Sequence, residues 1–206
     1  MKTIEINLYS VKELDEDAKE KAFNEYCGSE QYFWGDDNKA TLNEFERIFP
    51  VIIKDWRYGG GNSYINFCFT NDDDIENLSG VRLLKYLINN YYDYLYEPKT
   101  FTKNKMYTTN NKKRKSKIIY QKNDCRLTGY CLDCDILEPI YEFLKKPNKY
   151  ITFYDLMNDC LQSWLSACEK DYEYTYSEEA FIETSEANEW YYTKDGEFYA
   201  SIREAS

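Results

Sequence analysis

The 206-residue sequence contains no histidine. Histidine is the usual general base near neutral pH and the commonest zinc ligand in proteins. Its absence excludes Ser-His-Asp and Cys-His catalytic sites built from this chain alone. Long apolar runs are also missing, so we expect neither a membrane-spanning segment nor a secretory leader ahead of Ile4. The cytoplasm is therefore the expected location.

The seven cysteines raise the question of a metal or redox site. Cys131 and Cys134 form a CxxC pair, and Cys125 precedes Cys131 by six residues. A structural zinc site usually needs a second pair of ligands at similar spacing, whereas Cys160 and Cys168 are eight residues apart on a predicted helix. The pattern favours cysteines that pack as small apolar side chains. We expect no metal and no cofactor; zinc at Cys125, Cys131 and Cys134 is the alternative.

No other motif predicts a catalytic site. The glycines at residues 59–61 are not followed by the Lys-Ser/Thr pair and the helix of a phosphate-binding loop, so they indicate a turn. The aspartates at residues 72–74 lack the spacing of an EF-hand loop. The sequence does not distinguish Asp133 and Asp135 from ordinary acidic residues of a protein surface. We therefore expect a protein that is not an enzyme, with a metal-dependent nuclease built on these aspartates as the alternative.

Apolar periodicity and capping residues predict helices and short strands. Helices are predicted from an Asp15 N-cap through Tyr26 and over residues 42–49, 81–96, 135–144, 152–168 and 177–186. Strands are predicted over residues 4–8, 51–58, 64–70, 117–121, 126–132, 190–192 and 197–202, the last six as three hairpins. The predicted fold class is α+β, with antiparallel β-hairpins packed against several α-helices in a single domain over residues 1–206.

One segment of the chain is strongly cationic. Residues 99–123 contain nine lysines and arginines and no acid, and they predict a basic loop or flap at about residues 99–117. Its densest part could contact RNA or a phosphate backbone through Lys112, Lys113, Arg114 and Lys115. The alternative is a loop without a binding role.

The chain as a whole is acidic, with a net charge of −11. Such a chain is not attracted to nucleic acid in general, but it is attracted to the basic grooves that hold nucleic acid. Residues 169–206 contain 11 acids and three cations, a net charge of −8, interleaved with aromatics. The predicted partner-binding face comprises Glu173, Tyr174, Tyr176, Glu178, Glu179, Glu183, Trp190 and Tyr191. The alternative is an ordinary solvated acidic surface.

Several short motifs, spread over nearly the whole chain, occur in a familiar order. They are Ile4-Glu5-Ile6-Asn7-Leu8-Tyr9, Glu13-Leu14-Asp15-Glu16-Asp17-Ala18-Lys19-Glu20-Lys21-Ala22, Lys54-Asp55-Trp56-Arg57-Tyr58, Leu127-Thr128-Gly129-Tyr130-Cys131, Asp135-Ile136-Leu137, Pro139-Ile140, Glu186-Ala187-Asn188-Glu189-Trp190, Thr193 and Asp195-Gly196. In these motifs the chain resembles a group of phage and mobile-element proteins that are often labelled antitoxin-like. It departs from them at residues 59–61, where an aspartate-containing turn is expected. The resemblance implies a phage accessory protein and no catalytic residues.

Small acidic phage accessory proteins without catalytic residues commonly act against host machinery. The resulting hypothesis is a stoichiometric, cytoplasmic inhibitor of a bacterial defence system, foremost an anti-CRISPR protein that binds a CRISPR effector and blocks nucleic-acid binding or cleavage. The expected partner is thus a host protein or ribonucleoprotein, with RNA contact through the basic loop and no membrane. An antitoxin-like protein that neutralises a cognate toxin and a nucleic-acid-binding phage regulator are the alternatives.

Overall fold

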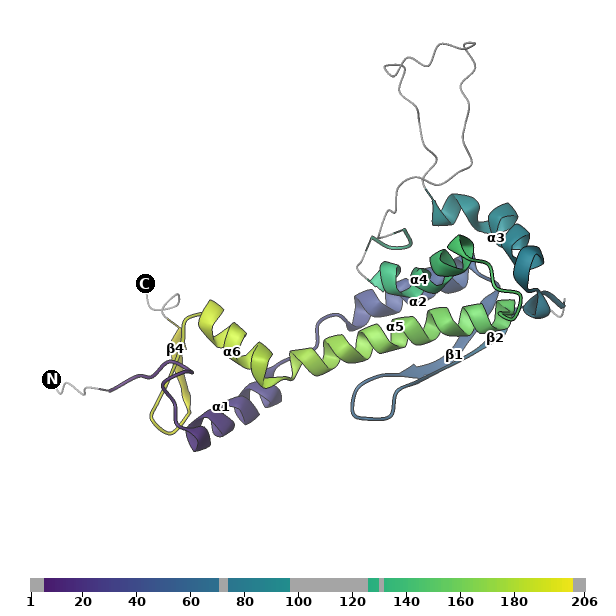
Figure 1. The fold of residues 1–206 in the computed structure, drawn as a ribbon. Helices are drawn as coiled ribbons and strands as arrows, with labels where there is room; N and C mark the ends of the chain where they lie inside the picture. Colours follow the sequence, from purple (N-terminus) through teal and green to yellow (C-terminus); the bar gives the residue numbers. More distant parts are fainter. Residues whose placement is uncertain (1–5, 71–73, 97–125, 130–131, 202–206) are drawn as a thin grey trace, which may run out of the picture. The chain divides into compact units, whose positions relative to one another are not determined.

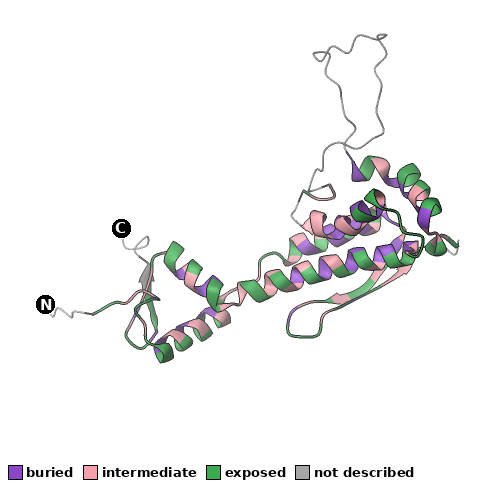
Figure 2. Cartoon of the chain, viewed as in Figure 1, coloured by how far each residue is buried: buried purple, intermediate pink, exposed green. Residues whose placement is uncertain are grey.

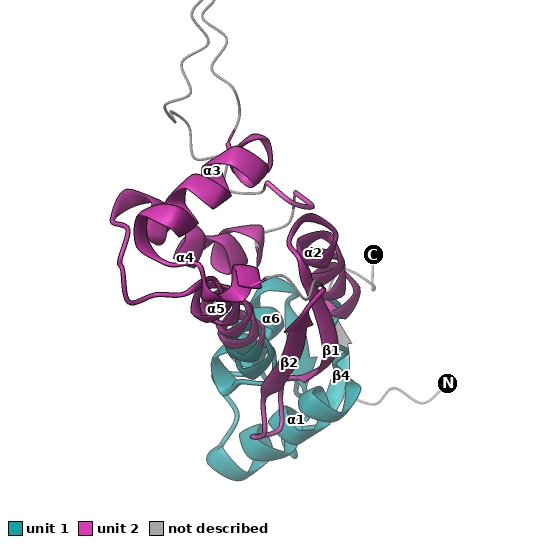
Figure 3. Ribbon diagram, turned by 90° about the vertical axis from the view of Figure 1, so that its right-hand side faces the viewer, with its two compact units in different colours: residues 1–33, 169–206 teal, residues 34–168 magenta. Residues whose placement is uncertain are grey.

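The computed structural model describes residues 6–70, 74–96, 126–129 and 132–201 (Figure 1). These residues form six α-helices, one 3-10 helix and two antiparallel β-hairpins, which confirms the predicted α+β class. The chain divides into two compact units (Figure 3). Unit 1 joins residues 1–33 to 169–206, and unit 2 comprises residues 34–168. Compact units of this kind can belong to one folding domain, so the single domain stays a prediction.

Unit 2 is built around a hydrophobic core shared by helices and one hairpin. Its elements are α2 (Gly35–Ile48), β1 (Val51–Arg57), β2 (Tyr64–Phe69), the 3-10 helix η1 (Asp74–Asn77), α3 (Gly80–Leu95), α4 (Leu132–Lys145) and the first part of α5 (Phe153–Thr175). At the centre lies Trp164 of α5, which is fully buried. Its indole Nε1 donates to the backbone oxygen of Asn38 at 3.2 Å, so the one polar atom of the side chain is satisfied. The rings of Trp56 and Tyr58 pack edge-on against it.

The β1–β2 hairpin forms from the two runs, residues 51–58 and 64–70, that predict it. Val51 pairs with Phe69 and Ile53 with Phe67, and the register shifts between Ile53 and Asp55. The connecting turn contains three glycines with positive φ at residues 59–61. Because side chains other than glycine rarely adopt positive φ, the three glycines permit this turn.

Unit 1 has its own smaller core. It contains α1 (Glu16–Ser29), the end of α5, α6 (Glu178–Ala187), β3 (Trp190–Tyr192) and β4 (Phe198–Ser201). Asp15 caps α1 by accepting from the N–H of Ala18, and Ser177 caps α6 in the same way, as the sequence predicts. Buried residues of α1, α6 and β3 meet in a cluster with Val11: Ala22, Tyr26, Phe181 and Tyr192. Figure 2 shows in purple that buried positions recur along α1 and α6.

The turn of the β3–β4 hairpin makes a very close backbone contact with α1. Gly196 has a φ of +78°, and a Cβ placed on it would lie 2.0 Å from the backbone oxygen of Ala18. A glycine is therefore required at residue 196 for two reasons: its backbone is left-handed, and the α1 backbone leaves no room for a side chain.

Two predicted strands are wrong within the described residues. At the predicted strand over 4–8, residues 6–8 form no ladder, and Tyr9 makes a single bridge with Tyr192. At the predicted strand over 126–132, residues 126–129 form a bend and Leu132 begins α4. Backbone N–H groups of this bend are bound by the Asp133 side chain, which competes with strand pairing. The strand predicted over 117–121 lies outside the described residues.

Helix boundaries also differ from the predicted ones. Helix α2 begins seven residues before the predicted start at Leu42, with Asp36 and Asp37 in its first turn. Helix α4 begins three residues before Asp135 and contains Pro139, which occupies an interior position. Helix α5 extends seven residues beyond the predicted end at Cys168.

Candidate binding surface

The described residues contain no group of three or more cysteines and acids that could hold a metal ion. Cys160 and Cys168 are fully buried in the core of unit 2, whereas Cys134 is half-buried. Burial raises the pKa of the Cys160 thiol well above its ordinary value, so this thiol stays protonated. Cys125 and Cys131 lie outside the described residues, and so do Asp72 and Asp73 of the alternative nuclease site.

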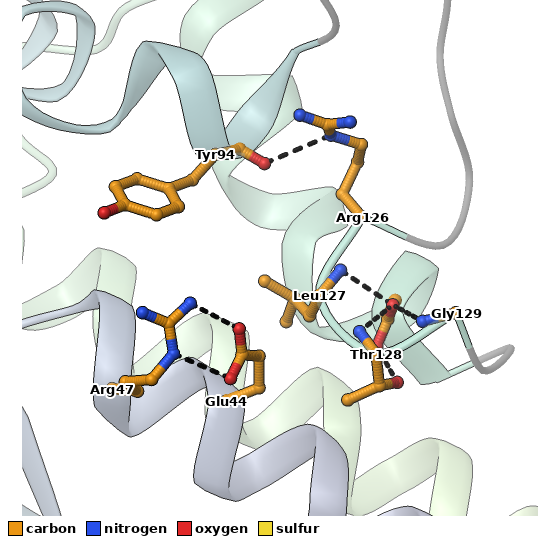
Figure 4. Close-up of polar contacts among 8 residues, drawn as sticks. Glu44, Arg47, Tyr94, Arg126, Leu127, Thr128 and Gly129 are labelled. Carbon is orange, nitrogen blue, oxygen red and sulfur yellow. Dashed lines mark hydrogen bonds and ion pairs between the residues drawn. The ribbon is translucent and has the colours of Figure 1, made fainter.

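Asp133 has a structural role that its sequence context does not reveal. The side chain is fully buried. It accepts hydrogen bonds from the N–H groups of Leu127, Thr128 and Gly129 at 2.8, 2.7 and 2.9 Å (Figure 4). The Thr128 hydroxyl donates at 2.8 Å and the Thr41 hydroxyl at 3.4 Å. A carboxylate bound this way fixes the start of α4, and its oxygens are engaged by internal donors.

Arg126 stabilises the C-terminus of α3, which has no basic residue in its last turn. Its Nε donates to the backbone oxygen of Tyr94 at 3.2 Å (Figure 4). Its Nη2 donates to the backbone oxygen of Asp93 at 2.9 Å. A cation at this end interacts favourably with the helix dipole. Nearby, the Arg47 guanidinium binds both oxygens of Glu44 and lies 5.9 Å from the centre of the Tyr94 ring. The predicted phosphate contacts, Lys112, Lys113, Arg114 and Lys115, lie outside the described residues.

The negative charge of the protein is concentrated in unit 1. Its described residues, 6–33 and 169–201, contain five lysines and 17 acids, a net charge of −12. The whole of unit 2, residues 34–168, contains 19 cations and 18 acids, a net charge of +1. The acidic surface therefore includes α1 as well as the predicted C-terminal third.

Three lysines of the N-terminal segment neutralise part of this surface. Salt bridges join Lys12 to Glu186, Lys19 to Glu178 and Lys21 to Glu197, the last at 3.0 Å. These pairs are largely exposed, so each adds at most about 1 kcal/mol to stability. Eleven further acids of unit 1 are exposed: Glu13, Asp15, Glu16, Asp17, Glu20, Glu25, Glu173, Glu179, Glu183, Glu189 and Asp195.

Among the predicted partner-binding residues, the structure joins Tyr174 to Glu183. The Tyr174 hydroxyl, on α5, donates to the Glu183 carboxylate, on α6, at 2.6 Å. This hydrogen bond raises the pKa of Tyr174, and the ring remains 46% exposed. Glu179 and Glu183 are both exposed and are one helical turn apart on the face of α6 opposite the buried Phe181. Glu173 and Glu178 are exposed as well.

The other predicted aromatics are partly committed to internal packing. The ring of Trp190 packs against Tyr26 and Phe198 at centroid distances of 6.5 and 5.4 Å. The ring of Tyr176 packs against Tyr172 at 4.8 Å, and its hydroxyl donates to the backbone oxygen of Glu30 at 3.4 Å. Tyr191 is half-buried. Tyr174 is therefore the most exposed aromatic of the predicted set.

Sequence reasoning missed three exposed aromatics of the same unit. Phe33 is 73% exposed, and Phe198 and Tyr199 on β4 are 46% and 52% exposed. Phe198 and Tyr199 are consecutive in a strand, so they point to opposite faces of the hairpin. The position after an Asp-Gly turn predicts a strand but does not indicate whether either face is covered.

No family model, curated protein or solved structure matches the chain. None of the helices in the described ranges is long and apolar enough to cross a membrane.

Proposed function

We propose that the protein is a stoichiometric inhibitor of a bacterial defence complex, foremost a CRISPR effector, and that it inserts the acidic surface of unit 1 into a basic nucleic-acid-binding groove. The main support is the separation of charge between the units, −12 on unit 1 against +1 on unit 2 over their whole length, and −12 against −4 over the described residues. An exposed tyrosine, Tyr174, lies within this acidic surface. The phage context comes from the sequence resemblance alone.

The binding surface centres on the end of α5 and the outer face of α6. Carboxylates there would take the place of phosphate groups against lysines and arginines of the groove. The charge of the whole unit would speed the encounter, because complementary potentials steer diffusion over distances of about a Debye length. Tyr174, oriented by Glu183, would provide the apolar anchor once water is displaced.

Co-purification tests the proposal. The tagged protein is expressed in bacterial hosts that carry several types of CRISPR effector, and the captured proteins and RNA are identified. Recovery of an effector, followed by titratable inhibition that is complete near one inhibitor per effector, is the expected result. Turnover at much lower protein levels would instead indicate an enzyme. Capture of the product of a neighbouring gene, with no effector bound, would favour the antitoxin alternative.

Charge reversal tests the surface. The double variant Glu173→Lys with Glu179→Lys changes two exposed acids of unit 1 and should weaken effector binding about tenfold or more, mainly through a slower on-rate. The matched control, Glu76→Lys with Asp93→Lys, makes the same change of charge at exposed positions of unit 2. Equal losses in the two variants would show that net charge alone matters and would contradict the assigned surface. An on-rate that does not fall with added salt would contradict electrostatic steering.

A further inference from the structure

The two edges of the β1–β2 hairpin are protected very differently. Edge strands of soluble proteins are normally blocked by charges, prolines, bulges or covering side chains, because an open edge pairs with other chains. Strand β1 has a bulge between Ile53 and Asp55, and its charged residues include Lys54. The carboxylate of Glu46, on α2, also accepts the N–H of Ile53 at 3.2 Å. The β1 edge is therefore blocked in three ways.

Within the described part of the chain, strand β2 is blocked by no charge, proline or bulge of its own. Its six residues, Tyr64–Phe69, include no charge, no proline and no glycine, in a chain that is 31% charged. The only strand paired with β2 among the described residues is β1, and helix α2 lies on the β1 side of the hairpin (Figure 3). The exposed ring of Tyr154 stacks on Phe67 at 5.2 Å, beside this strand.

The register shows which backbone groups of β2 point outward. Thr70 donates to the backbone oxygen of Pro50 at 3.0 Å, so this pair is hydrogen-bonded across the hairpin. Antiparallel ladders alternate bonded and non-bonded pairs. The pairs Val51–Phe69 and Ile53–Phe67 are therefore non-bonded, which agrees with the outward N–H of Ile53. By the same alternation, the N–H and C=O groups of Phe67 and Phe69, and of Ile65 two residues earlier, point away from β1.

We propose that the open edge of β2 pairs antiparallel with β2 of a second copy of this chain, so that two hairpins form one four-stranded sheet. If Ile65, Phe67 and Phe69 all hydrogen-bond to the second copy, Phe67 lies opposite the partner's Phe67 and Ile65 lies opposite the partner's Phe69. The neutral strand meets itself without opposed like charges. The described residues of unit 2 contain 10 cations and 14 acids, a net charge of −4, so two copies repel each other less there than at unit 1, whose described residues carry −12. The dimer does not depend on the proposed function.

Sedimentation velocity over protein concentrations from about 1 to about 500 µM tests the dimer. One strand pair is a small interface, so we expect a dissociation constant on the order of 10–100 µM. Asn66→Lys places an exposed charge on the edge strand and should weaken dimerisation about fivefold to tenfold, as should Asn66→Glu. An equimolar mixture of the two variants should recover the dimer, because the two residues 66 are diagonal neighbours across the strand pair and would then carry opposite charges in place of like ones. Unchanged thermal unfolding of each variant controls for the fold.

Disulfide trapping tests the register. In the proposed pairing residue 66 lies opposite the partner's Cys68 as a non-bonded pair, with Cα atoms about 4.5 Å apart, which suits a disulfide. Asn66→Cys should therefore cross-link into dimers under mild oxidation, and Asn66→Cys with Cys68→Ser should not. A wild-type protein that stays monomeric at every concentration overturns the proposal. The proposal is also overturned if a dimer forms whose stability is unchanged by Asn66→Lys and Asn66→Glu and which Asn66→Cys does not cross-link. If Asn66→Lys instead abolishes binding of a different protein, the β2 edge belongs to that protein.

Discussion

Replacing Gly196 by alanine should destabilise unit 1 far more than an ordinary glycine substitution. The residue has a φ of +78°, where an alanine costs about 1–2 kcal/mol. Its new Cβ would also lie 2.0 Å from the backbone oxygen of Ala18 and 2.8 Å from the carbonyl carbon. Both are backbone atoms of the capped first turn of α1, so relief requires the hairpin or the helix to move. Such overpacking costs about 1–3 kcal/mol, for a total of about 2–5 kcal/mol.

Two matched variants separate the contributions. Gly60→Ala has a similar φ of +72°, but nothing lies within 4 Å of the added Cβ, so it should show the backbone cost alone. Gly28→Ala lies in α1 of the same unit, has no contact within 4 Å, and should stabilise by about 0.5–1 kcal/mol through helix propensity. Urea unfolding followed by circular dichroism and tryptophan fluorescence measures all three. If Gly196→Ala costs no more than Gly60→Ala, the close contact with α1 is not real and the reasoning fails.

Three further predictions concern carboxylates and caps. Asp133→Asn should cost about 2–4 kcal/mol, because the new amide N–H₂ opposes the N–H donors that the carboxylate binds, and Asp93→Asn at an exposed position should be nearly neutral in the same urea assay. Ser177→Ala removes the N-cap of α6 and should cost about 1 kcal/mol, whereas Ser177→Asp should keep most of that stability. Hydrogen bonds from the N–H and hydroxyl of Thr152 lower the pKa of Asp155 below its usual value of 3.8. The stabilisation is therefore present above pH 3.8 and lost below it, so the deficit of Asp155→Asn should shrink as the pH falls from about 5 to about 2, and a constant deficit would contradict the cause given.

The parts of the fold that sequence predicts well depend on local chemistry. Asp15 and Ser177 are recognisable N-caps, and both bond the expected N–H. The glycines at residues 59–61 and the Asp-Gly pair at 195–196 mark the two hairpin turns, and both hairpins form. In these places one short segment contains all the groups that decide its conformation.

The predictions that are wrong concern segments whose conformation or exposure depends on residues elsewhere in the chain. Residues 126–132 have the composition of a strand, but the Asp133 carboxylate binds three of their N–H groups and forms a bend instead. Charge counting identifies the acidic C-terminal third but not its neutralisation by Lys12, Lys19 and Lys21 from the other end of the chain. Nor does a count of aromatics separate the exposed Tyr174 from Trp190, which packs against Tyr26.

The discontinuous make-up of unit 1 affects the order in which the protein can fold. Its two segments, residues 1–33 and 169–206, are separated by all of unit 2, so its contacts span long stretches of sequence. Closing such a loop is slow relative to forming local contacts. During synthesis the continuous segment 34–168 emerges whole while α1 still lacks α6 and β3, and with them the apolar partners Phe181 and Tyr192. A nascent chain would therefore expose the apolar face of α1 until translation has passed the β3–β4 hairpin, which makes this helix the expected contact for a chaperone on the ribosome.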